Sequence, residues 1–275
     1  MQHIKIAAMT AVVLTGALCI FSCSDSSRTH EGITLESYSY DGFACLNPDS
    51  AYVGESPVYL RATGRGVIPV AIGEADITVL RDSLQIIAGV DLSQDGKVLL
   101  RRTSEYSPVE VVDTLGIETD SFEENELSVV LMTPRVIVWR SFSAGYTAGA
   151  AHGRYSTTYL NYSIDDNRIL GVYDLLRPNT KSELEELVRD QLKDNRSLLV
   201  PVDQITLPAN FEITADGLNF IYGIYEIAPY AAGEIVVNLD YYALSDILVP
   251  EMLEMLTGRD EKGDASRPKP ATTPI

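Results

Sequence analysis

The sequence predicts an α+β fold in which antiparallel β-sheets pack with about three helices. Segments that alternate apolar and polar residues follow one another in hairpin order, and segments with helical spacing stand between groups of them. Regular βαβ alternation, which would indicate a parallel sheet, does not occur. We therefore expect antiparallel sheets covered by helices.

The alternating segments mark the strands, and turn residues separate several of them. Asp216-Gly217 joins two apolar runs as a tight hairpin would, and Asp165-Asp166-Asn167 closes a strand before the next apolar run. The predicted strands cover residues 33–40, 56–62, 126–133, 135–142, 154–164, 211–214, 218–227 and 234–240.

The clearest helix is expected at residues 180–194. Thr180 and Glu183 have the spacing of a capping box, and apolar residues follow at helical intervals. Because both the start signal and the periodicity agree, this segment should form a helix in the C-terminal half.

Two further segments have helical spacing. The first covers 72–88 and should end at Gly89. The second covers 241–256 and is interrupted at Pro250, which suits the first turn of a helix but not its interior. The residues of the first helix that should point inward are Ile72, Val79, Leu80, Ser83, Leu84 and Ile87.

The N-terminus has the order of a secretion signal. Lys5 supplies a positive charge, residues 6–21 form an apolar stretch without a charged side chain, and a polar run follows. The stretch is shorter than the roughly 20 residues that a membrane-spanning helix needs. We interpret residues 1–22 as a signal peptide.

Cys23 is the expected lipid attachment site. An apolar residue stands three positions before it and the small Ser22 directly before it, as bacterial lipoprotein processing requires. Several acyl chains on one cysteine anchor a protein firmly to a membrane. Ser24 replaces the aspartate that retains lipoproteins in the inner membrane of enteric bacteria. We expect an extracytoplasmic, lipid-anchored protein of the cell envelope, and the outer membrane is favoured.

The mature chain should have four parts. Residues 23–32 are polar and form a tether, and 33–125 form a smaller N-terminal α+β region. Residues 126–258 form the C-terminal domain, and 259–275 contain too few large apolar residues to fold. The acidic stretch at 118–126 is expected to be a surface loop that divides the two folded regions.

The chain is strongly acidic, with 21 Lys and Arg against 39 Asp and Glu and a net charge of −18. Nucleic acid binding draws most of its affinity from cations that neutralise phosphates, so it is excluded. One interpretation of the charge is solubility, and the other is long-range attraction of a cationic partner.

Few side chains could perform catalysis or bind a metal. His152 is the one imidazole available to the folded part, and neither an H-E-x-x-H nor a C-x-x-C spacing occurs. The G-x-S-x-G elbow of a serine hydrolase is also missing. We expect no catalytic residue, no metal and no cofactor, and the sequence alone favours a structural hydrogen bond for His152.

Tyrosine is the abundant aromatic residue, with 15 copies against 6 phenylalanines. Many of these tyrosines fall within two segments, 144–153 with the strand after it and 220–233, which read AGYTAGAAHG and FIYGIYEIAPYAAG. Tyrosine suits half-buried strands, and it also suits recognition surfaces because it combines a large ring with a hydrogen-bonding tip.

These two segments are similar to the extracytoplasmic domain of the RsiV type, a domain of unknown function best known from a lysozyme-sensing anti-sigma factor. The resemblance spans 126–248, and 68–90 resembles the helix of a smaller region that often precedes this domain. The resemblance implies an α+β fold that binds a muramidase. A lysozyme is strongly cationic, so the acidic charge of the chain would raise the rate of encounter.

Our leading hypothesis is a non-enzymatic envelope lipoprotein that binds a protein or wall-derived ligand, with a cationic lysozyme-like hydrolase as the first candidate. One alternative is an enzyme acting on envelope glycans through His152 and carboxylates near Glu226. Another is a structural lipoprotein of envelope assembly. The candidate binding residues are Tyr146, His152, Tyr155, Tyr225, Glu226 and Tyr230.

Overall fold

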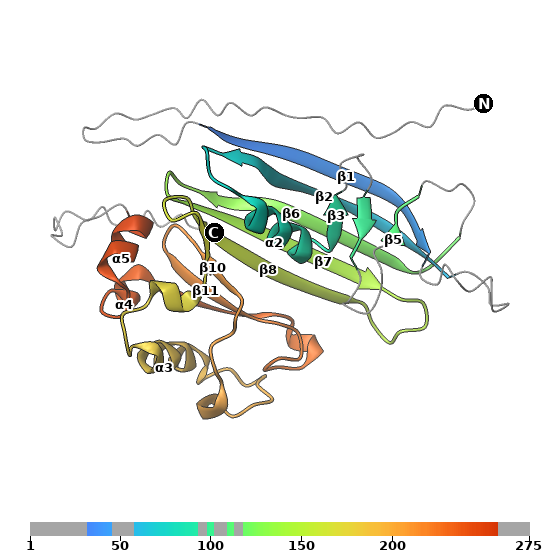
Figure 1. Cartoon of the computed structure of the whole chain (residues 1–275). Helices are drawn as coiled ribbons and strands as arrows, with labels where there is room; N and C mark the ends of the chain where they lie inside the picture. The colour runs from blue at the N-terminus through green and yellow to red at the C-terminus, as the bar shows by residue number, and fades with distance from the viewer. Residues whose placement is uncertain (1–31, 46–57, 93–97, 102–108, 113–117, 258–275) are drawn as a thin grey trace, which may run out of the picture.

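The computed structural model describes residues 32–45, 58–92, 98–101, 109–112 and 118–257. The predicted signal peptide, Cys23, all but the last residue of the tether and the C-terminal tail lie outside these ranges, so those predictions stay predictions. The described chain confirms an α+β fold. A long sheet with a helix and a small sheet on one side is followed by a second layer of strands and helices (Figure 1).

The long sheet has six strands and takes them from both halves of the sequence. They lie in the order β1 (Ile33–Cys45), β2 (Tyr59–Ile72), β6 (Phe122–Met132), β7 (Val136–Tyr146), β8 (Arg154–Ser163) and β9 (Arg168–Leu170). Antiparallel pairing is confirmed with one exception, since β2 and β6 run parallel. The chain between them crosses over the sheet and returns to the same end, as a parallel pair requires.

Strand β6 shows that the prediction of a surface loop at 118–126 is wrong. The strand begins inside this segment and occupies the middle of the sheet, so the expected division after residue 125 falls within it. Glu123 is buried and paired with Arg154 of β8, whereas Glu126 is half-exposed and paired with an arginine of β2. The arginines that pair with these two glutamates come from other strands. The sequence of the segment alone therefore looks like that of an exposed loop.

Helix α2 (Thr78–Ile87) covers one face of the long sheet and is shorter than the predicted 72–88. Ile72 ends β2 instead of starting the helix, and Val79, expected inward, is 72 % exposed. The buried face runs along the whole helix through Ile77, Leu80, Leu84 and Ala88, at spacings of three and four residues, and Val79 is not on this line. Gly89 ends the helix with a φ of +66°, as expected.

A small sheet follows α2 and extends the inner layer. It consists of β3 (Val90–Leu92), β4 (Val98–Leu100) and β5 (Val109–Glu110), which the sequence did not predict because each strand is too short to show alternation. Val90 and Leu100 pack with α2 and the long sheet in one hydrophobic core.

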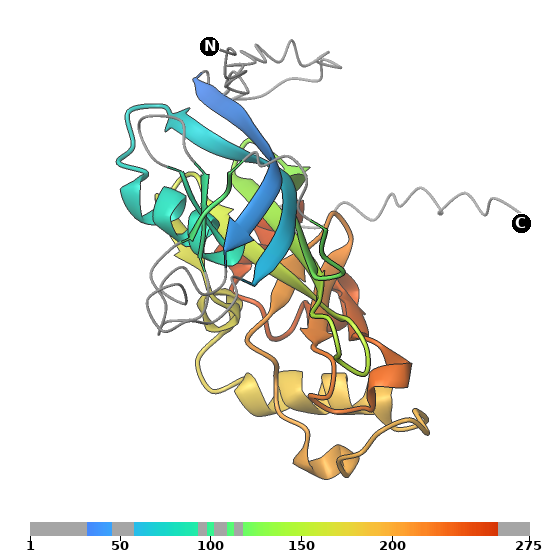
Figure 2. The ribbon, with the colours of Figure 1, turned by 90° about the vertical axis from the view of Figure 1, so that its right-hand side faces the viewer.

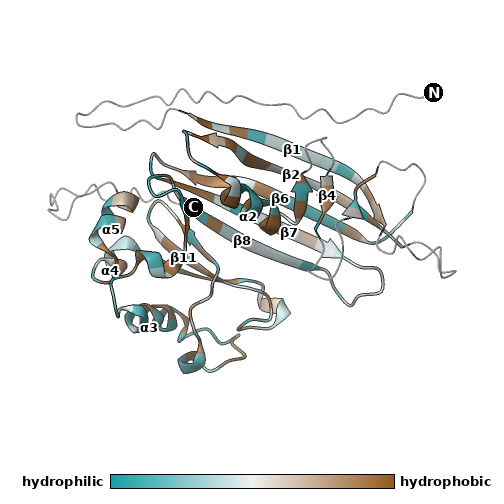
Figure 3. Ribbon diagram, viewed as in Figure 1, coloured by the Kyte–Doolittle hydropathy of each residue, from teal (hydrophilic) through white to brown (hydrophobic). Residues whose placement is uncertain are grey.

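The C-terminal half is built on a three-stranded antiparallel sheet in the order β10 (Phe211–Ile213), β11 (Gly217–Tyr222) and β12 (Ile235–Asp240). Helix α3 (Lys181–Leu192) buries Leu184, Val188 and Leu192 in a second core with this sheet and presents hydrophilic residues to solvent (Figure 3). The predicted third helix forms as α4 (Tyr241–Leu244) and α5 (Pro250–Thr257), with the break where Pro250 stands. Within the described ranges, no helix is long and apolar enough to cross a membrane.

Two local details of this half differ from expectation. The capping box at the start of α3 does not form, because the hydroxyl of Thr180 donates instead to the carbonyl of Arg177 at 2.8 Å. The strand predicted at 218–227 ends at Tyr222, because a turn closes when the amide of Glu226 donates to the carbonyl of Gly223. Both differences depend on short-range turns that compete with the regular element.

The two sheets are joined along β8 by side chains. Asn161 donates from Nδ2 to the carbonyl of Phe211 at 2.8 Å, and its Oδ1 accepts from a β10 amide at 2.9 Å. Asn210, directly before β10, binds the backbone of β8. It donates to the carbonyl of Thr157 at 2.6 Å and accepts from the amide of Tyr159 at 2.9 Å. These four bonds fix the C-terminal sheet, and the loops it carries, against β8.

Candidate functional site

Four of the six predicted binding residues meet in the folded chain, and we call them the aromatic cluster: His152, Tyr155, Tyr225 and Tyr230. The imidazole of His152 stacks on the Tyr230 ring, with 4.0 Å between centroids and 28° between planes. Tyr155 meets Tyr230 edge-on at 6.4 Å, and Tyr225 lies 5.9 Å from the same ring. Contacts of this kind stabilise aromatic pairs beyond the effect of burial.

Two segments carry the cluster. Tyr155 stands on β8, and His152 lies in the turn between β7 and β8. Tyr225 and Tyr230 belong to the connection from β11 to β12, where Pro229 precedes the short helix η3 (Tyr230–Ala232). Figure 2 shows the β7–β8 hairpin beside this connection. The two motifs of the sequence, far apart along the chain, therefore form one site.

Both ring nitrogens of His152 have partners. Nδ1 lies 2.8 Å from the carbonyl oxygen of Gly153, which can only accept, so Nδ1 carries the hydrogen. Nε2 lies 3.2 Å from the phenol oxygen of Tyr225 and, in the neutral ring, accepts a hydrogen bond from the Tyr225 hydroxyl. The imidazole is exposed, so these bonds orient it at the surface instead of burying it.

The backbone around the cluster takes conformations that few residues adopt. Tyr225 has a φ of +65°, in the left-handed region that is costly for a bulky side chain. Gly233 has a φ of +71°, and a Cβ there would lie 2.8 Å from the phenol oxygen of Tyr155. Strained residues persist where the surrounding structure holds them, and they gather at functional sites.

The other two predicted residues do not join the ring contacts. Tyr146 ends β7 opposite Phe122. Glu226 accepts a hydrogen bond from the amide of Gly223 at 2.7 Å, so its carboxylate closes the turn that contains the strained Tyr225. Its role is to shape the loop that presents Tyr225.

Sequence reasoning missed two contributors. Phe142 of β7 lies 6.5 Å from Tyr155 and extends the cluster over the sheet. Glu234 accepts a hydrogen bond from the amide of Thr157 at 2.6 Å and fixes the start of β12 to β8. Both residues were inside predicted strands, but only the fold shows which strands are adjacent.

One of the two segments that carry the cluster is acidic. From 197 to 257 the chain carries nine Asp or Glu residues and no Lys or Arg, a pattern that was visible in the sequence. Burial and the nearby carboxylates of Glu212 and Glu234 raise the pKa of Tyr159, which stands on β8 beyond the cluster. A cation would therefore meet a favourable potential here.

The cluster offers ring faces and hydroxyl groups rather than reactive groups. None of the hydrogen bonds found for His152 in the described chain comes from a carboxylate, and no group of three His, Cys, Asp or Glu residues in that part could hold a metal. What these side chains can do directly is stack on, and hydrogen-bond to, a partner surface.

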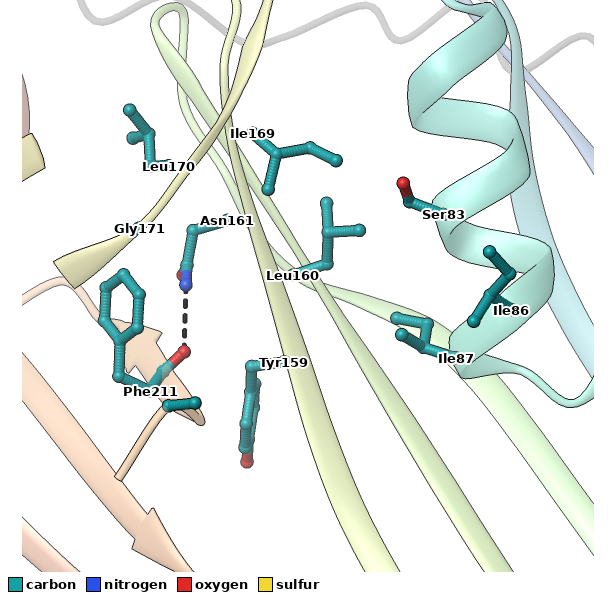
Figure 4. Close-up of a pocket in the computed structure, with 11 residues that line it drawn as sticks. Ser83, Ile86, Ile87, Tyr159, Leu160, Asn161, Ile169, Leu170, Gly171 and Phe211 are labelled. Atoms are coloured by element: carbon teal, nitrogen blue, oxygen red, sulfur yellow. Dashed lines mark hydrogen bonds between the residues drawn. The ribbon is translucent and has the colours of Figure 1, made fainter. Parts of the chain in front are cut away.

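A separate groove of about 360 Å³ lies between α2 and the joint of the two sheets (Figure 4). Its walls are mostly apolar, with Ile86 and Ile87 on the helix side and Leu160, Ile169 and Phe211 opposite. The one amide in view, Asn161, is already bonded to the Phe211 carbonyl. The groove lacks the convergent polar groups that orient a ligand.

Comparison with known proteins finds a family match within the C-terminal half. Residues 173–242 match the family described as "Protein of unknown function (DUF3298)", a range that includes Tyr225 and Tyr230 but not His152. No curated protein matches the chain.

Two solved structures have the same fold. One is a DUF3298 family member from Bacteroides fragilis NCTC 9343, 21 % identical, with a TM-score of 0.52, covering 83 % of this chain and 99 % of its own. The other is a DUF3298 family protein from Pseudomonas aeruginosa PAO1, 16 % identical, with a TM-score of 0.54, covering 82 % and 98 %. The chain therefore contains a DUF3298 match and shares the fold of DUF3298 proteins.

Proposed function

We propose that the protein is a non-enzymatic, lipid-anchored protein of the cell envelope whose aromatic cluster binds a partner outside the cytoplasm. The partner is a protein or a wall-derived ligand, and the first candidate is a cationic lysozyme-like hydrolase. The observation that carries the proposal is the His152–Tyr230 stack at the surface, in which His152 is exposed and Tyr230 belongs to the acidic stretch 197–257.

The arrangement of the cluster supports recognition. Tyr225 is 58 % exposed although its backbone is strained, so the fold holds a large ring in solvent at a conformational cost. Rigid aromatic side chains dominate the binding energy of many protein interfaces because they bury a large area and lose little conformational freedom. A ring fixed before binding adds affinity by lowering the cost of ordering.

The charge of the chain supports a cationic partner. Complementary potentials raise the rate of encounter, and the effect falls with salt. A lysozyme would be drawn to the acidic surface and then retained by short-range contacts with the rings. If charge governs encounter and ring contacts govern retention, salt should lower the association rate and change the dissociation rate less.

The test is binding of a lysozyme to the full chain in detergent, at salt concentrations of about 0.01 M and 1 M, between which the Debye length falls from roughly 30 to 3 Å. We expect binding at low salt and at least a tenfold loss in affinity for Tyr230→Ala or Tyr225→Ala. The matched control is Tyr173→Ala, because Tyr173 is 56 % exposed and lies outside the cluster. Lack of binding at low salt would refute the lysozyme assignment.

An enzyme that acts on envelope glycans is the alternative, and the exposure of the His152 imidazole favours it. In that case the neutral ring would act as a base through Nε2, which now accepts from Tyr225. Incubation of the chain with wall fragments, followed by product analysis, separates the two functions. Turnover that His152→Gln abolishes would replace the binding proposal.

A further inference from the structure

The two edges of the long sheet differ in how many of their outward backbone groups have hydrogen-bond partners. At the β8 edge, Asn210 and Glu234 bind the backbone groups of Thr157 and Tyr159, and β9 pairs with residues 161–163 at the end of the strand. The backbone there has no free row of donors and acceptors to offer another strand. Natural sheets protect their edges in this way because an open edge invites pairing with another chain.

The opposite edge is β1, and within the described residues its outer side is paired at one place. Phe43 exchanges two hydrogen bonds with Val112, each 2.9 Å long, on the side away from β2. Backbone groups alternate in direction along an antiparallel strand, so the amides and carbonyls of Ser37, Ser39 and Asp41 point the same way. Beyond Phe43, these outward groups have no hydrogen-bond partner in the part of the chain that the structure describes.

The sequence of β1 lacks the residues that usually block an edge. Its thirteen residues, ITLESYSYDGFAC, include no Lys, Arg or Pro, and the one irregularity of register lies at its start, between Thr34 and Leu35. The strand is also longer than most, since strands commonly have five or six residues. Long, regular edges without such blocks are sites of strand addition.

Charge repulsion does not protect this edge either, although the chain as a whole is acidic. The carboxylate of Glu36 is paired with Arg81 at 3.2 Å, and that of Asp41 with Arg61 at 3.3 Å. Both acids of β1 are therefore compensated by arginines of the same chain. Two copies can approach along this edge without the penalty that the net charge would otherwise impose.

We propose that β1 pairs antiparallel with β1 of a second copy of the chain, so that two six-stranded sheets form one continuous sheet across a two-fold axis. An axis at Glu36 places Leu35 opposite Ser37 and Ile33 opposite Ser39, so that β1 of the second copy ends before Phe43, where Val112 is bonded. These four outward residues of each copy then form four pairs with two bonds each, about eight backbone hydrogen bonds. The closed two-fold arrangement prevents further growth.

The test is the oligomeric state of the full chain in detergent, measured as protein mass by light scattering, for the wild type and for Ser39→Pro. Proline removes the outward amide of residue 39 and leaves the inward bonds to β2 in place. Ser39→Ala is the matched control, because it removes the same hydroxyl and keeps the amide. We expect dimers for the wild type and Ser39→Ala, and monomers for Ser39→Pro at an unchanged melting temperature.

Ser37→Pro gives a second, independent disruption of the same edge and should also yield monomers. If Ser39→Pro lowers the melting temperature, the oligomeric state of Ser37→Pro is the deciding measurement. A monomeric wild type at its highest soluble concentration, or a dimer that survives both proline variants, would overturn the proposal. The outcome does not depend on lysozyme binding, because the aromatic cluster lies at the β8 side of the sheet.

Discussion

Arg154 on β8 donates a hydrogen bond to the carboxylate of Glu123 on β6 at 2.9 Å, across Gly145 of the strand between them. A Cβ at Gly145 would lie 3.1 Å from the guanidinium carbon, so the glycine leaves the path open. From the other side, Asn125 of β6 donates to the phenol oxygen of Tyr40 at 3.0 Å. The buried acid of the central strand is therefore held within a short polar network.

Replacing Arg154 with Met should destabilise the fold because it leaves the Glu123 carboxylate, 11 % exposed, without its cation. We expect a loss of roughly 1–3 kcal/mol in the free energy of unfolding, toward the lower end because solvent screens the exposed arginine. Urea unfolding measures it. Adding Glu123→Gln should restore part of the loss, whereas Arg65→Met, which breaks the exposed pair with Glu126, should change little.

Substituting Gly233 with Ala tests the close approach of the loop to Tyr155. The variant should lose roughly 1–3 kcal/mol from backbone strain alone, because a φ of +71° with a ψ of −159° is essentially confined to glycine, and more from the contact between the new Cβ and the Tyr155 oxygen. Gly73→Ala is the control, since Gly73 has a φ of +55° and open space around it. Equal melting temperatures for the two variants would contradict the close approach.

Alkaline pH should destabilise the protein through its buried tyrosines. Burial, together with the charge of Glu123, raises the pKa of Tyr40 to about 12, and burial also raises the pKa of Tyr38. The folded state then keeps protons that the unfolded state releases above a pH of about 10. Stability is full below that pH and is lost as the pH rises through the folded pKa.

Urea unfolding across this range measures the effect, and Tyr40→Phe should flatten it. The control is Tyr242→Phe, because Tyr242 is exposed. A free energy of unfolding that stays constant up to a pH of about 12 would show that these tyrosines titrate normally.

Asn161→Leu should weaken the joint between the sheets. The variant leaves the carbonyl of Phe211 and the amide of Ile213 without their partner in a buried place, at roughly 1–3 kcal/mol for each group. Asn219→Leu is the control, since Asn219 also makes two side-chain bonds, but to Glu212 and Asn238 at the surface. Hydrogen exchange should show faster opening of β10 only in the first variant.

The sequence predicted the parts of the fold that depend on neighbouring residues. The turns at Asp165-Asp166-Asn167 and Asp216-Gly217 and the break at Pro250 are local, and each is confirmed. The parallel β2–β6 pair and the burial of Glu123 depend on residues far along the chain, so no local pattern contained them.

The same distinction applies to the site. Two glycine- and tyrosine-rich segments predicted His152, Tyr155, Tyr225 and Tyr230, and the fold brings these residues together. Glu226 was chosen for its charge, but its carboxylate is used within its own turn. Phe142 gave no signal of its own, because an aromatic residue in a strand is ordinary.

The strand order also has a mechanical consequence. β1, the first strand after the N-terminal segment, lies at one edge of the long sheet, and β8, which carries Tyr155, lies near the other. If Cys23 carries the proposed anchor and a partner holds the aromatic cluster, tension would act across the strand pairs between β1 and β8 in series. The shortest ladder on this path is β2–β6, with six paired positions against thirteen for β1–β2, so this parallel pair is where we expect the sheet to open first.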